Sequence, residues 1–415
     1  MKLVIYWFRN DLRLVDNPAF VRANAIADSV LPIYIHQASS LKTDYGFERV
    51  GMHRQHFLFQ SLDSLRAQLQ DLGSDLREYE GQPEEVISDL MKGVGADAVY
   101  CEHIEAPEEI EQCRRIRGQG IALEEIWQSS MLDPRVLPFD LVKMPDVFTQ
   151  FRQAVEKEKL TFTNPISAPK SLSPLPKNLQ VQNLPKRVNF ETATSYYHGG
   201  EEVAQAHLVQ YLGRRLPDTY KQTRNKLIGI DYSSKFSPWL ALGCISVRDI
   251  ACQIAKYERR HGPNEGTYWL WFELLWRDYF RFIHFKYGKK LYQARGLGKA
   301  AAKPFDSSQF ERWSQGKTGI DFVDAGMREL SHTGFLSNRM RQIVASYWIY
   351  DLGGDWRAGA AWFESQLIDY DVYSNQGNWL YIAGLGTDPR GGRPFNIAKQ
   401  AREHDPDGAY QRMWL

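Results

Sequence analysis

Short apolar runs alternate with amphipathic segments over residues 1–130, and this alternation limits the possible folds more than any other feature of the chain. One amphipathic segment, 56–73, has its apolar residues at helical spacing. Strands that alternate with helices pair in parallel, and helices cover both faces of their sheet. We therefore predict an α/β domain with a doubly wound parallel sheet over residues 1–130. The apolar runs are residues 2–8, 30–36, 75–81, 97–102 and 120–128.

The rest of the chain changes character twice. Residues 167–188 are rich in proline and polar residues and lack periodicity, which is typical of an extended linker, whereas 145–158 has the pattern of a short helix. From residue 201 onward the pattern is helical throughout, and this part holds ten of the twelve tryptophans. We predict an interdomain linker over 131–200 and an all-α domain over 201–415.

The charge balance excludes a globally basic nucleic-acid binder. The 415 residues contain 51 Lys and Arg against 50 Asp and Glu, which gives a net charge of +1. Any contact with nucleic acid must therefore involve a local patch. With 43% hydrophobic residues the chain is long enough for two globular domains, and we expect a monomer.

The cysteines and the apolar runs limit the compartment. Cys101, Cys113, Cys244 and Cys252 are spaced too widely for a paired CxxC zinc site, and nothing else indicates a disulfide framework. Six apolar residues, 3–8, stand together before charges return, too few for a signal-peptide core, and no run approaches a membrane span. We predict a cytoplasmic protein with no metal site and no membrane contact.

The stretch 338–381 concentrates polar groups that a packed core does not accommodate. As a helix, 338–350 has an apolar face behind and a polar face in front. Two carboxylates, Asp369 and Asp371, follow, and then an amide and an indole, Asn375 and Trp379. Such a mixture lines a cavity more readily than it fills a core, and it suits a flat, polar-edged, redox-active ring. The apolar face comprises Met340, Ile343, Val344, Tyr347 and Trp348, and the polar face Asn338, Arg341, Gln342 and Ala345.

The order and spacing of several motifs resemble the DNA photolyase and cryptochrome family, and within it the DASH branch. The resemblance implies an antenna-type α/β domain at residues 1–130 and an FAD-binding all-α domain at 201–415, a photolyase-like fold. The motifs are WFRNDLRLVDNPA (7–19), SSKFSPWLALGCIS (233–246), WFELLWRDYF (271–280), GKTGIDFVDAGMREL (316–330), NRMR (338–341), DWR (355–357), LIDYD (367–371) and NQGNW (375–379).

The resemblance also implies an FAD site. Its pyrophosphate cradle comprises Tyr220, Ser233, Ser234, Lys235, Phe236 and Ser237. Hydroxyls and a cation near a helix start suit phosphate oxygens, although an ordinary helix cap uses serine as well. Arg277 would reach the FAD, and Asp371 and Asn375 would face the flavin ring, the amide opposite N5. Asn338 and Arg341 would line the flavin and adenine, with Asp369 paired to Arg341.

A substrate site is implied next to the cofactor. Glu273 would accept hydrogen bonds from a pyrimidine and Trp276 would stack on it, although Glu273 and Arg277, at i and i+4, also have the spacing of an ion pair with each other. Gln342 and Tyr381 stand where standard dimer photolyases have methionine and tryptophan, as in the DASH branch. A more polar and less wedge-like pocket favours single-stranded DNA as the substrate.

Three tryptophans match an electron relay of the family. Trp379, Trp356 and Trp313 each lie in a motif of their own and would pass electrons from the surface to the photoexcited flavin. Large core side chains are the alternative, and to that role we assign the remaining candidates. These packing tryptophans are Trp269, Trp271, Trp348 and Trp362.

Two further features concern DNA and an antenna. Residues 281–303 hold seven Lys or Arg and no acid, and with RGGRPF (390–395) they suit phosphate contacts, although a solvated charged surface is the alternative. Glu108 lies roughly where the family places a contact to a folate antenna, methenyltetrahydrofolate. A solvated glutamate at a helix start beside Pro107 is the interpretation we favour for it.

The function that the resemblance implies is blue-light-dependent DNA repair. The chain would be a DASH-type deoxyribodipyrimidine photolyase that splits cyclobutane pyrimidine dimers by electron transfer from excited, reduced FAD, with the damaged bases flipped out of the stack. A blue-light photoreceptor that binds DNA with little repair is the alternative. A plain flavin oxidoreductase is disfavoured because the sequence contains no GxGxxG, and it contains no GxxxxGK[ST] either.

Overall fold

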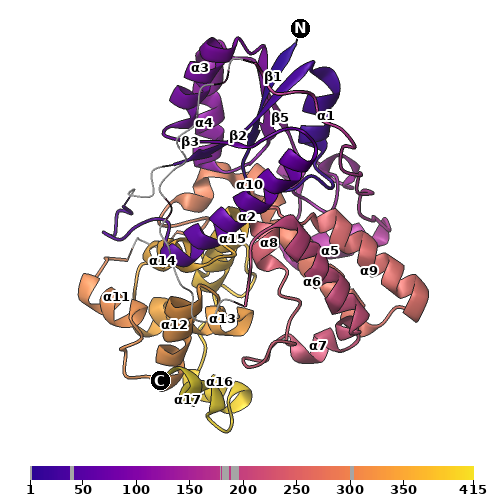
Figure 1. Ribbon diagram of the computed structural model, residues 1–415. Helices are drawn as coiled ribbons and strands as arrows, with labels where there is room; N and C mark the ends of the chain where they lie inside the picture. The colour runs from indigo at the N-terminus through magenta and orange to yellow at the C-terminus, as the bar shows by residue number, and fades with distance from the viewer. Residues whose placement is uncertain (1, 38–41, 178, 180–186, 188–195, 300–302) are drawn as a thin grey trace.

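The amino-terminal domain is built on a parallel sheet of five strands in the order β3-β2-β1-β4-β5 (Figure 1). The computed structural model describes residues 2–37, 42–177, 179, 187, 196–299 and 303–415. Every strand pair in the sheet is parallel, and Ile5 in the central strand pairs with Leu31 on one side and Val99 on the other. The prediction of a parallel α/β domain is confirmed. The strands are β1 (Leu3–Phe8), β2 (Ser29–His36), β3 (Arg77–Glu80), β4 (Ala98–Glu102) and β5 (Leu123–Ile126).

Helices cover both faces of the sheet because successive side chains of a strand point to opposite faces. In β1, Val4, Tyr6 and Phe8 pack with α1 (Pro18–Ile26) and α2 (Met52–Asp71). Ile5 and Trp7 pack on the other face. That face is covered by α3 (Pro83–Val94) and α4 (Pro107–Gly118). The sheet is therefore doubly wound, as the apolar runs predicted.

The second domain is entirely helical among the described residues after 196 (Figure 1). Its longest helix, α10, begins at Glu265 after a capping box between Asn264 and Thr267, six residues before the apolar run that predicted it. The helices are α6 (Glu201–Gly213), α7 (Tyr220–Thr223), α8 (Ser237–Ala241), α9 (Val247–His261), α10 (Glu265–Tyr287), α11 (Ser307–Ser314), α12 (Asp321–Thr333), α13 (Asn338–Ser346), α14 (Trp356–Gln366), α15 (Val372–Ala383), α16 (Ile397–His404) and α17 (Ala409–Trp414).

The segment between the domains is packed rather than free. The backbone N–H groups of Met131 and Leu132 donate to the buried carboxylate of Asp278 in α10, at 2.9 and 2.8 Å. The predicted short helix is present as α5 (Phe148–Lys157), which also packs on α10. Pro174, in the described part of the predicted extended linker, accepts a hydrogen bond from the backbone of β2. Residues 178, 180–186 and 188 of that linker lie outside the described part.

The two domains share one hydrophobic core. The buried carboxylate of Glu201 in α6 accepts hydrogen bonds from the backbone of Leu14 and Val15, at 2.7 and 3.0 Å. Asp16 and Arg248 add a buried ion pair with an N–O distance of 2.8 Å. These contacts hold the α/β domain against the helical one. Among the described residues, no helix is long and apolar enough to span a membrane.

Candidate cofactor and substrate site

A cavity of about 410 Å³ lies within the helical domain. Its walls come from α7, α8, α10, α13, α14 and α15 and from the segments before α8 and α15. Its volume is in the range of ~300–1,000 Å³ typical of small-molecule sites. Every residue that the sequence assigned to cofactor or to substrate lines this one cavity. These residues are Tyr220, Ser233, Ser234, Lys235, Phe236, Ser237, Glu273, Trp276, Arg277, Asn338, Arg341, Gln342, Asp369, Asp371, Asn375 and Tyr381.

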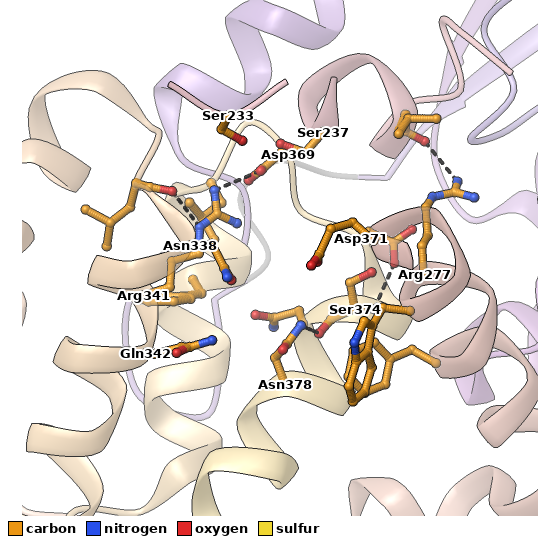
Figure 2. Close-up of a pocket in the computed structure, with 18 of the residues that line it drawn as sticks. Ser233, Ser237, Arg277, Asn338, Arg341, Gln342, Asp369, Asp371, Ser374 and Asn378 are labelled. Atoms are coloured by element: carbon orange, nitrogen blue, oxygen red, sulfur yellow. Dashed lines mark hydrogen bonds and ion pairs between the residues drawn. The ribbon is translucent and has the colours of Figure 1, made fainter. Parts of the chain in front are cut away.

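One wall is the polar face of α13. Figure 2 shows Asn338, Arg341 and Gln342 on this wall, with Arg277 on the opposite side. The opposite face of α13 is buried, as its periodicity predicted: Met340 and Ile343 are fully inaccessible to solvent. The helix begins where the Ser337 hydroxyl accepts from the backbone of Met340, and it continues into a π-helical turn, Tyr347–Asp351.

Arg341 is held by two interactions within the cavity wall. Its guanidinium donates to Asp369 at 2.8 Å and to the Leu336 carbonyl at 2.7 Å (Figure 2). The predicted pairing of Arg341 with Asp369 is therefore present. The other carboxylate oxygen of Asp369, Oδ1, is buried and has no hydrogen-bond partner in the described part of the chain. A buried acceptor without a donor is costly, so this oxygen marks a place for a donor group of a ligand.

The predicted phosphate cradle contains Lys235, a cation that forms no ion pair within 4 Å among the described residues. Lys235 is 8% exposed, and its Nζ lies 3.8 Å from the centre of the Tyr232 ring. Burial lowers the pKa of Lys235 to about 8, against the weaker opposing effects of Glu329 and Asp231. The N-cap position of α8 is Phe236, which makes no side-chain cap. The neighbouring serines therefore do not have the role of an ordinary helix cap.

Asp371 stands at the entrance to α15 and is tightly paired. Its carboxylate accepts from the backbone of Ser374 at 2.8 Å and forms an ion pair with Arg281 at 2.5 Å. Burial opposes its charge, but Arg281 and then Arg277 outweigh burial and lower the pKa of Asp371 to about 2. The carboxylate is therefore ionised, and it accepts hydrogen bonds at all physiological pH values.

Asn375, on the first turn of α15, has a fixed orientation. Its side-chain nitrogen donates to the Ala360 carbonyl at 3.0 Å, and no hydrogen bond in the described part of the chain engages its amide oxygen. A bound group can therefore meet that oxygen.

Glu273 and Arg277 do not pair with each other. Glu273 pairs with Arg224 at 2.6 Å, whereas Arg277 donates to the carbonyls of Ser129 and Leu240, at 2.5 and 3.3 Å. Burial, helped by the like charge of Arg281, lowers the pKa of Arg277 to about 9. Burial also raises the pKa of Glu273 against the attraction of Arg224. The i, i+4 spacing of Glu273 and Arg277 therefore did not predict the partner of either residue.

The basic strip at 281–303 is only partly a surface. Arg281 is 2% exposed and forms an ion pair with Asp371, so the prediction that it contacts phosphate is wrong. Lys286 donates to the Met144 carbonyl at 2.6 Å and to Asp146 at 2.7 Å. Lys303 donates to the Ile349 carbonyl at 2.5 Å. The residues of the strip that remain exposed without such a contact are Lys289, Lys290, Arg295 and Lys299.

Three arginines at the cavity were missed as a group by sequence reasoning. Arg224 and Arg393 line the cavity, and Arg339 contacts the cavity residue Gln342 at 3.3 Å. Burial and the like charges of Arg224 and Arg393 lower the pKa of Arg339. Arg224 pairs with Glu273 and Arg393 pairs with Asp388, so among the described residues Arg339 is the one of the three without an ion pair within 4 Å, and the repulsion favours an anion beside it. We call Arg224, Arg339 and Arg393 the arginine cluster. Their positions within RNK, NRMR and RGGRPF were visible, but their proximity was not.

The three tryptophans predicted to form the relay are buried, and two of them are in ring contact. Trp379 lines the cavity, and its ring centre is 6.4 Å from that of Trp313. Among the described residues no ring contact joins Trp356 to either of them, and its indole donates to the Ala294 carbonyl. All three are at most 5% exposed, so the expectation that one of them reaches the surface is wrong.

Of the tryptophans assigned to packing, Trp348 is fully buried as expected. Its ring centre also lies 5.3 Å from that of Trp313, which extends the cluster away from the cavity. Trp269, Trp271 and Trp362 are only half-buried and pack against the edge of the core.

Glu108 lies in the first turn of α4, as the helix-start interpretation expected. It is 59% exposed and pairs with Arg49 at 2.7 Å, and Arg49 also pairs with Glu364 of the helical domain. Among the described residues, no three His, Cys, Asp or Glu side chains gather as metal ligands.

Comparison with protein-family models accounts for both parts of the chain. Residues 4–171 match the model of DNA photolyase, and residues 269–415 match the model of the FAD binding domain of DNA photolyase. The second match includes α10 and the helices α13 to α15 that form most of the cavity. Fold and cavity thus define a protein of the photolyase class.

The relatives narrow this class further. The chain is 45% identical to a cryptochrome DASH of Xenopus laevis over 100% of its own length and 82% of the relative's, and 44% identical to one of Synechocystis over 99% and 87%. A crystal structure of a Synechocystis cryptochrome matches with a TM-score of 0.94 at 43% identity, covering 100% of this chain and 89% of that one. The chain therefore belongs to the photolyase/cryptochrome family, in its cryptochrome DASH branch.

Proposed function

We propose that this protein is a blue-light-dependent, FAD-containing enzyme that repairs cyclobutane pyrimidine dimers, preferentially in single-stranded DNA. The observation that carries this proposal is the single cavity in which all expected cofactor residues and all expected pyrimidine contacts meet. A separate cofactor pocket and base pocket would not allow direct electron transfer between them.

The residues of the cavity fit FAD. The unpartnered Oδ1 of Asp369 requires a donor, and in the described part of the chain the buried ammonium of Lys235 forms no ion pair within 4 Å. Ribityl hydroxyls and phosphate oxygens supply these two kinds of partner. Asp371 and the amide oxygen of Asn375 offer acceptors for the polar edge of the ring. When bound and reduced, FAD supplies an electron to the dimer under blue light, and the electron returns after the bonds between the two bases have broken.

The protein's own contribution is to bind and orient both partners. Arg341 and Asp369 are locked to each other, and Arg281 holds Asp371, so the polar wall is formed before any ligand arrives. Such preorganisation avoids the cost of rearranging charges during the reaction. Because electron transfer splits the dimer, no side chain has to act as general acid or base in the step.

The DNA side of the cavity is charged and aromatic. The arginine cluster suits the phosphates that flank a flipped base, and Glu273, held by Arg224, offers an acceptor for the N–H groups of a pyrimidine. Trp276 supplies a ring for stacking. These residues act on binding, and so they set which base reaches the cofactor.

Two polar side chains at the cavity, those of Gln342 and Tyr381, favour single-stranded DNA as the substrate. Gln342 and Tyr381 both line the cavity. The guanidinium carbon of Arg393 lies over the Tyr381 ring, 4.5 Å from the centre of that ring. An amide and a hydroxyl-bearing ring separate stacked base pairs less well than apolar side chains do. The protein should therefore prefer single-stranded DNA, in which the damaged bases are already unpaired.

A repair assay with matched substrates tests the proposal. The flavin-loaded, reduced protein is illuminated with blue light in the presence of a thymine-dimer oligonucleotide, either alone or annealed to its complement. We expect restoration of thymine absorbance and faster turnover on the single strand. Absence of repair on both substrates at full FAD occupancy would overturn the proposal, and faster repair of the duplex would overturn the strand preference.

A photoreceptor with DNA binding but little repair is the second candidate. The contact of Trp379 with Trp313, and of Trp313 with Trp348, favours light-driven electron transfer to the cavity whether or not DNA is repaired. The same assay separates the two roles. A protein that photoreduces its FAD and binds the oligonucleotide without splitting the dimer would be a photoreceptor.

A further inference from the structure

Trp276 is in contact with four aromatic rings. The ring of Phe148 is stacked on one face of the indole, with ring centres 3.7 Å apart and planes 12° apart. Tyr279 and Tyr381 meet the indole edge-on, at 5.4 and 5.6 Å and at angles of 89° and 83°. Phe280, which lines the cavity, lies 5.4 Å from the indole with its plane tilted by 36°. The indole plane is therefore fixed by four neighbouring rings.

Phe148 lies behind the indole and outside the cavity. Trp276 is among the residues that line the cavity, and Phe148 is not. Phe148 is 4% exposed, whereas Trp276 is half-buried. Since one face of the indole is covered, a base in the cavity can stack only on the other face.

The covering ring is itself immobilised. Phe272 and Tyr279 meet Phe148 edge-on, at 5.2 Å and 5.4 Å with interplanar angles of 82° and 80°. Phe148 is the first residue of α5, which the sequence assigned to the interdomain linker. The next inward-facing ring of α5, Phe151, contacts Tyr279 and Phe282 and lies 6.3 Å from Phe148. Among the described residues, Phe151 makes no ring contact with Trp276.

We propose that Phe148 is a positioning residue for pyrimidine recognition, which acts through Trp276 and makes the interdomain segment part of the substrate site. The inference rests on the proposed function. Without the ring of Phe148 the indole can tilt back into the space behind it, and its outer face no longer lies flat against the base. The stack of Phe148, Trp276 and pyrimidine then loses one ordered layer.

Two matched substitutions in α5 test this role. Phe148→Leu removes the stacked ring but retains most of the apolar volume, and Phe151→Leu makes the same change one turn further along the helix, away from Trp276. Binding of a single-stranded thymine-dimer oligonucleotide and of its undamaged counterpart is measured for each flavin-loaded protein, together with FAD content and thermal unfolding. We expect Phe148→Leu to reduce the preference for damaged over undamaged DNA by about tenfold, the scale of one aromatic stacking interaction. Phe151→Leu should retain the preference.

A double-mutant cycle shows whether Phe148 acts through the indole. In a Trp276→Ala background, Phe148→Leu should leave the remaining preference unchanged, because there is no indole left to position. If Phe148→Leu lowers the preference equally in both backgrounds, or not at all in the wild type, the inference is wrong while the proposed function stands. If the wild type shows no preference for damaged DNA, the substrate assignment itself fails, and the inference fails with it.

Discussion

Arg281 in α10 and Asp371 at the start of α15 form a buried ion pair, with an N–O distance of 2.5 Å, between positions ninety residues apart. Arg281 is 2% exposed, and its guanidinium also lies 4.7 Å from the centre of the Tyr373 ring. The pair joins α10, which carries the cavity residues Glu273, Trp276 and Arg277, to α15, which carries the cavity residues Asn375 and Trp379. Its geometry therefore determines how the two halves of the site meet.

Removal of the cation should cost stability and flavin. Arg281→Met leaves a buried, unpaired carboxylate, for which we expect a loss of about 3–5 kcal/mol in the free energy of unfolding and a lower FAD content after purification. Denaturant unfolding and flavin absorbance measure the two effects. Arg295→Met, an exposed residue of the same basic strip, is the control and should change neither. Unchanged stability in Arg281→Met would show that Asp371 finds another partner.

Helix α13 and Arg281 show where prediction from the sequence succeeds and where it fails. The two faces of α13 followed from their 3.6-residue period, because burial of Met340 and exposure of Arg341 to the cavity depend only on positions in one helix. Arg281 was misread as a surface charge, because its partner lies ninety residues further along the chain. Local periodicity says which face is buried, but it does not say which distant charge meets it.

Ring contacts were unpredictable for a related reason. Trp313 was predicted to belong to a relay that starts at the surface, but packing of α11 against the core buries it against Trp348. Phe148 and Trp276 lie in different predicted regions, and nothing in the spacing of either indicates the stack. Motif resemblance therefore located the cavity residues well, whereas relations between elements required the structure.

The arginine cluster should bind phosphates. Arg339→Ala should weaken binding of damaged and undamaged single-stranded DNA alike and should reduce the salt slope of the binding constant by ~0.7 for one lost phosphate contact. Fluorescence anisotropy at several salt concentrations measures this slope. Arg114→Ala, a 70% exposed position on α4, is the control. An unaltered slope in Arg339→Ala would place the phosphates elsewhere.

Light-driven reduction of bound FAD should depend on the tryptophans in contact with one another. Trp379→Phe and Trp313→Phe should each slow reduction by a thiol under blue light, because phenylalanine is harder to oxidise than indole. Trp348→Phe should do the same if the cluster of 5.3 and 6.4 Å contacts carries the electron. Repair by protein that was reduced chemically beforehand should be unaffected. An unchanged rate in Trp348→Phe, together with slower reduction in Trp356→Phe, would instead support the relay of Trp379, Trp356 and Trp313 expected from the sequence.

Stability should fall at alkaline pH because of His103. Burial lowers its pKa, but hydrogen bonds to Glu105 and Glu125, at 2.8 and 3.0 Å, outweigh burial and raise the pKa to about 9. A raised pKa stabilises the fold fully below the unfolded value of about 6.5, and the contribution is lost as pH rises through about 9. The melting temperature of the wild type should therefore decline across this window by more than that of His103→Gln. If the melting temperatures of the wild type and His103→Gln decline in parallel with rising pH, groups other than His103 cause the decline.

Close approach of the backbone to Trp379 explains a glycine in α14. A Cβ built at Gly359 would lie 2.2 Å from Cη2 and 2.6 Å from Cζ3 of Trp379, so the indole would have to shift. We expect Gly359→Ala to lower the free energy of unfolding by about 1–3 kcal/mol, the usual cost of overpacking. Because the shifted indole no longer sits between the cavity and Trp313, photoreduction should slow as well.

Gly213→Ala, at the last position of α6 with no atom within 4 Å, is the matched control and should be neutral or slightly stabilising. If Gly359→Ala destabilises the protein but photoreduces at the wild-type rate, the position of Trp379 does not limit electron entry. If it does neither, the helix accommodates the methyl group by moving away from α15.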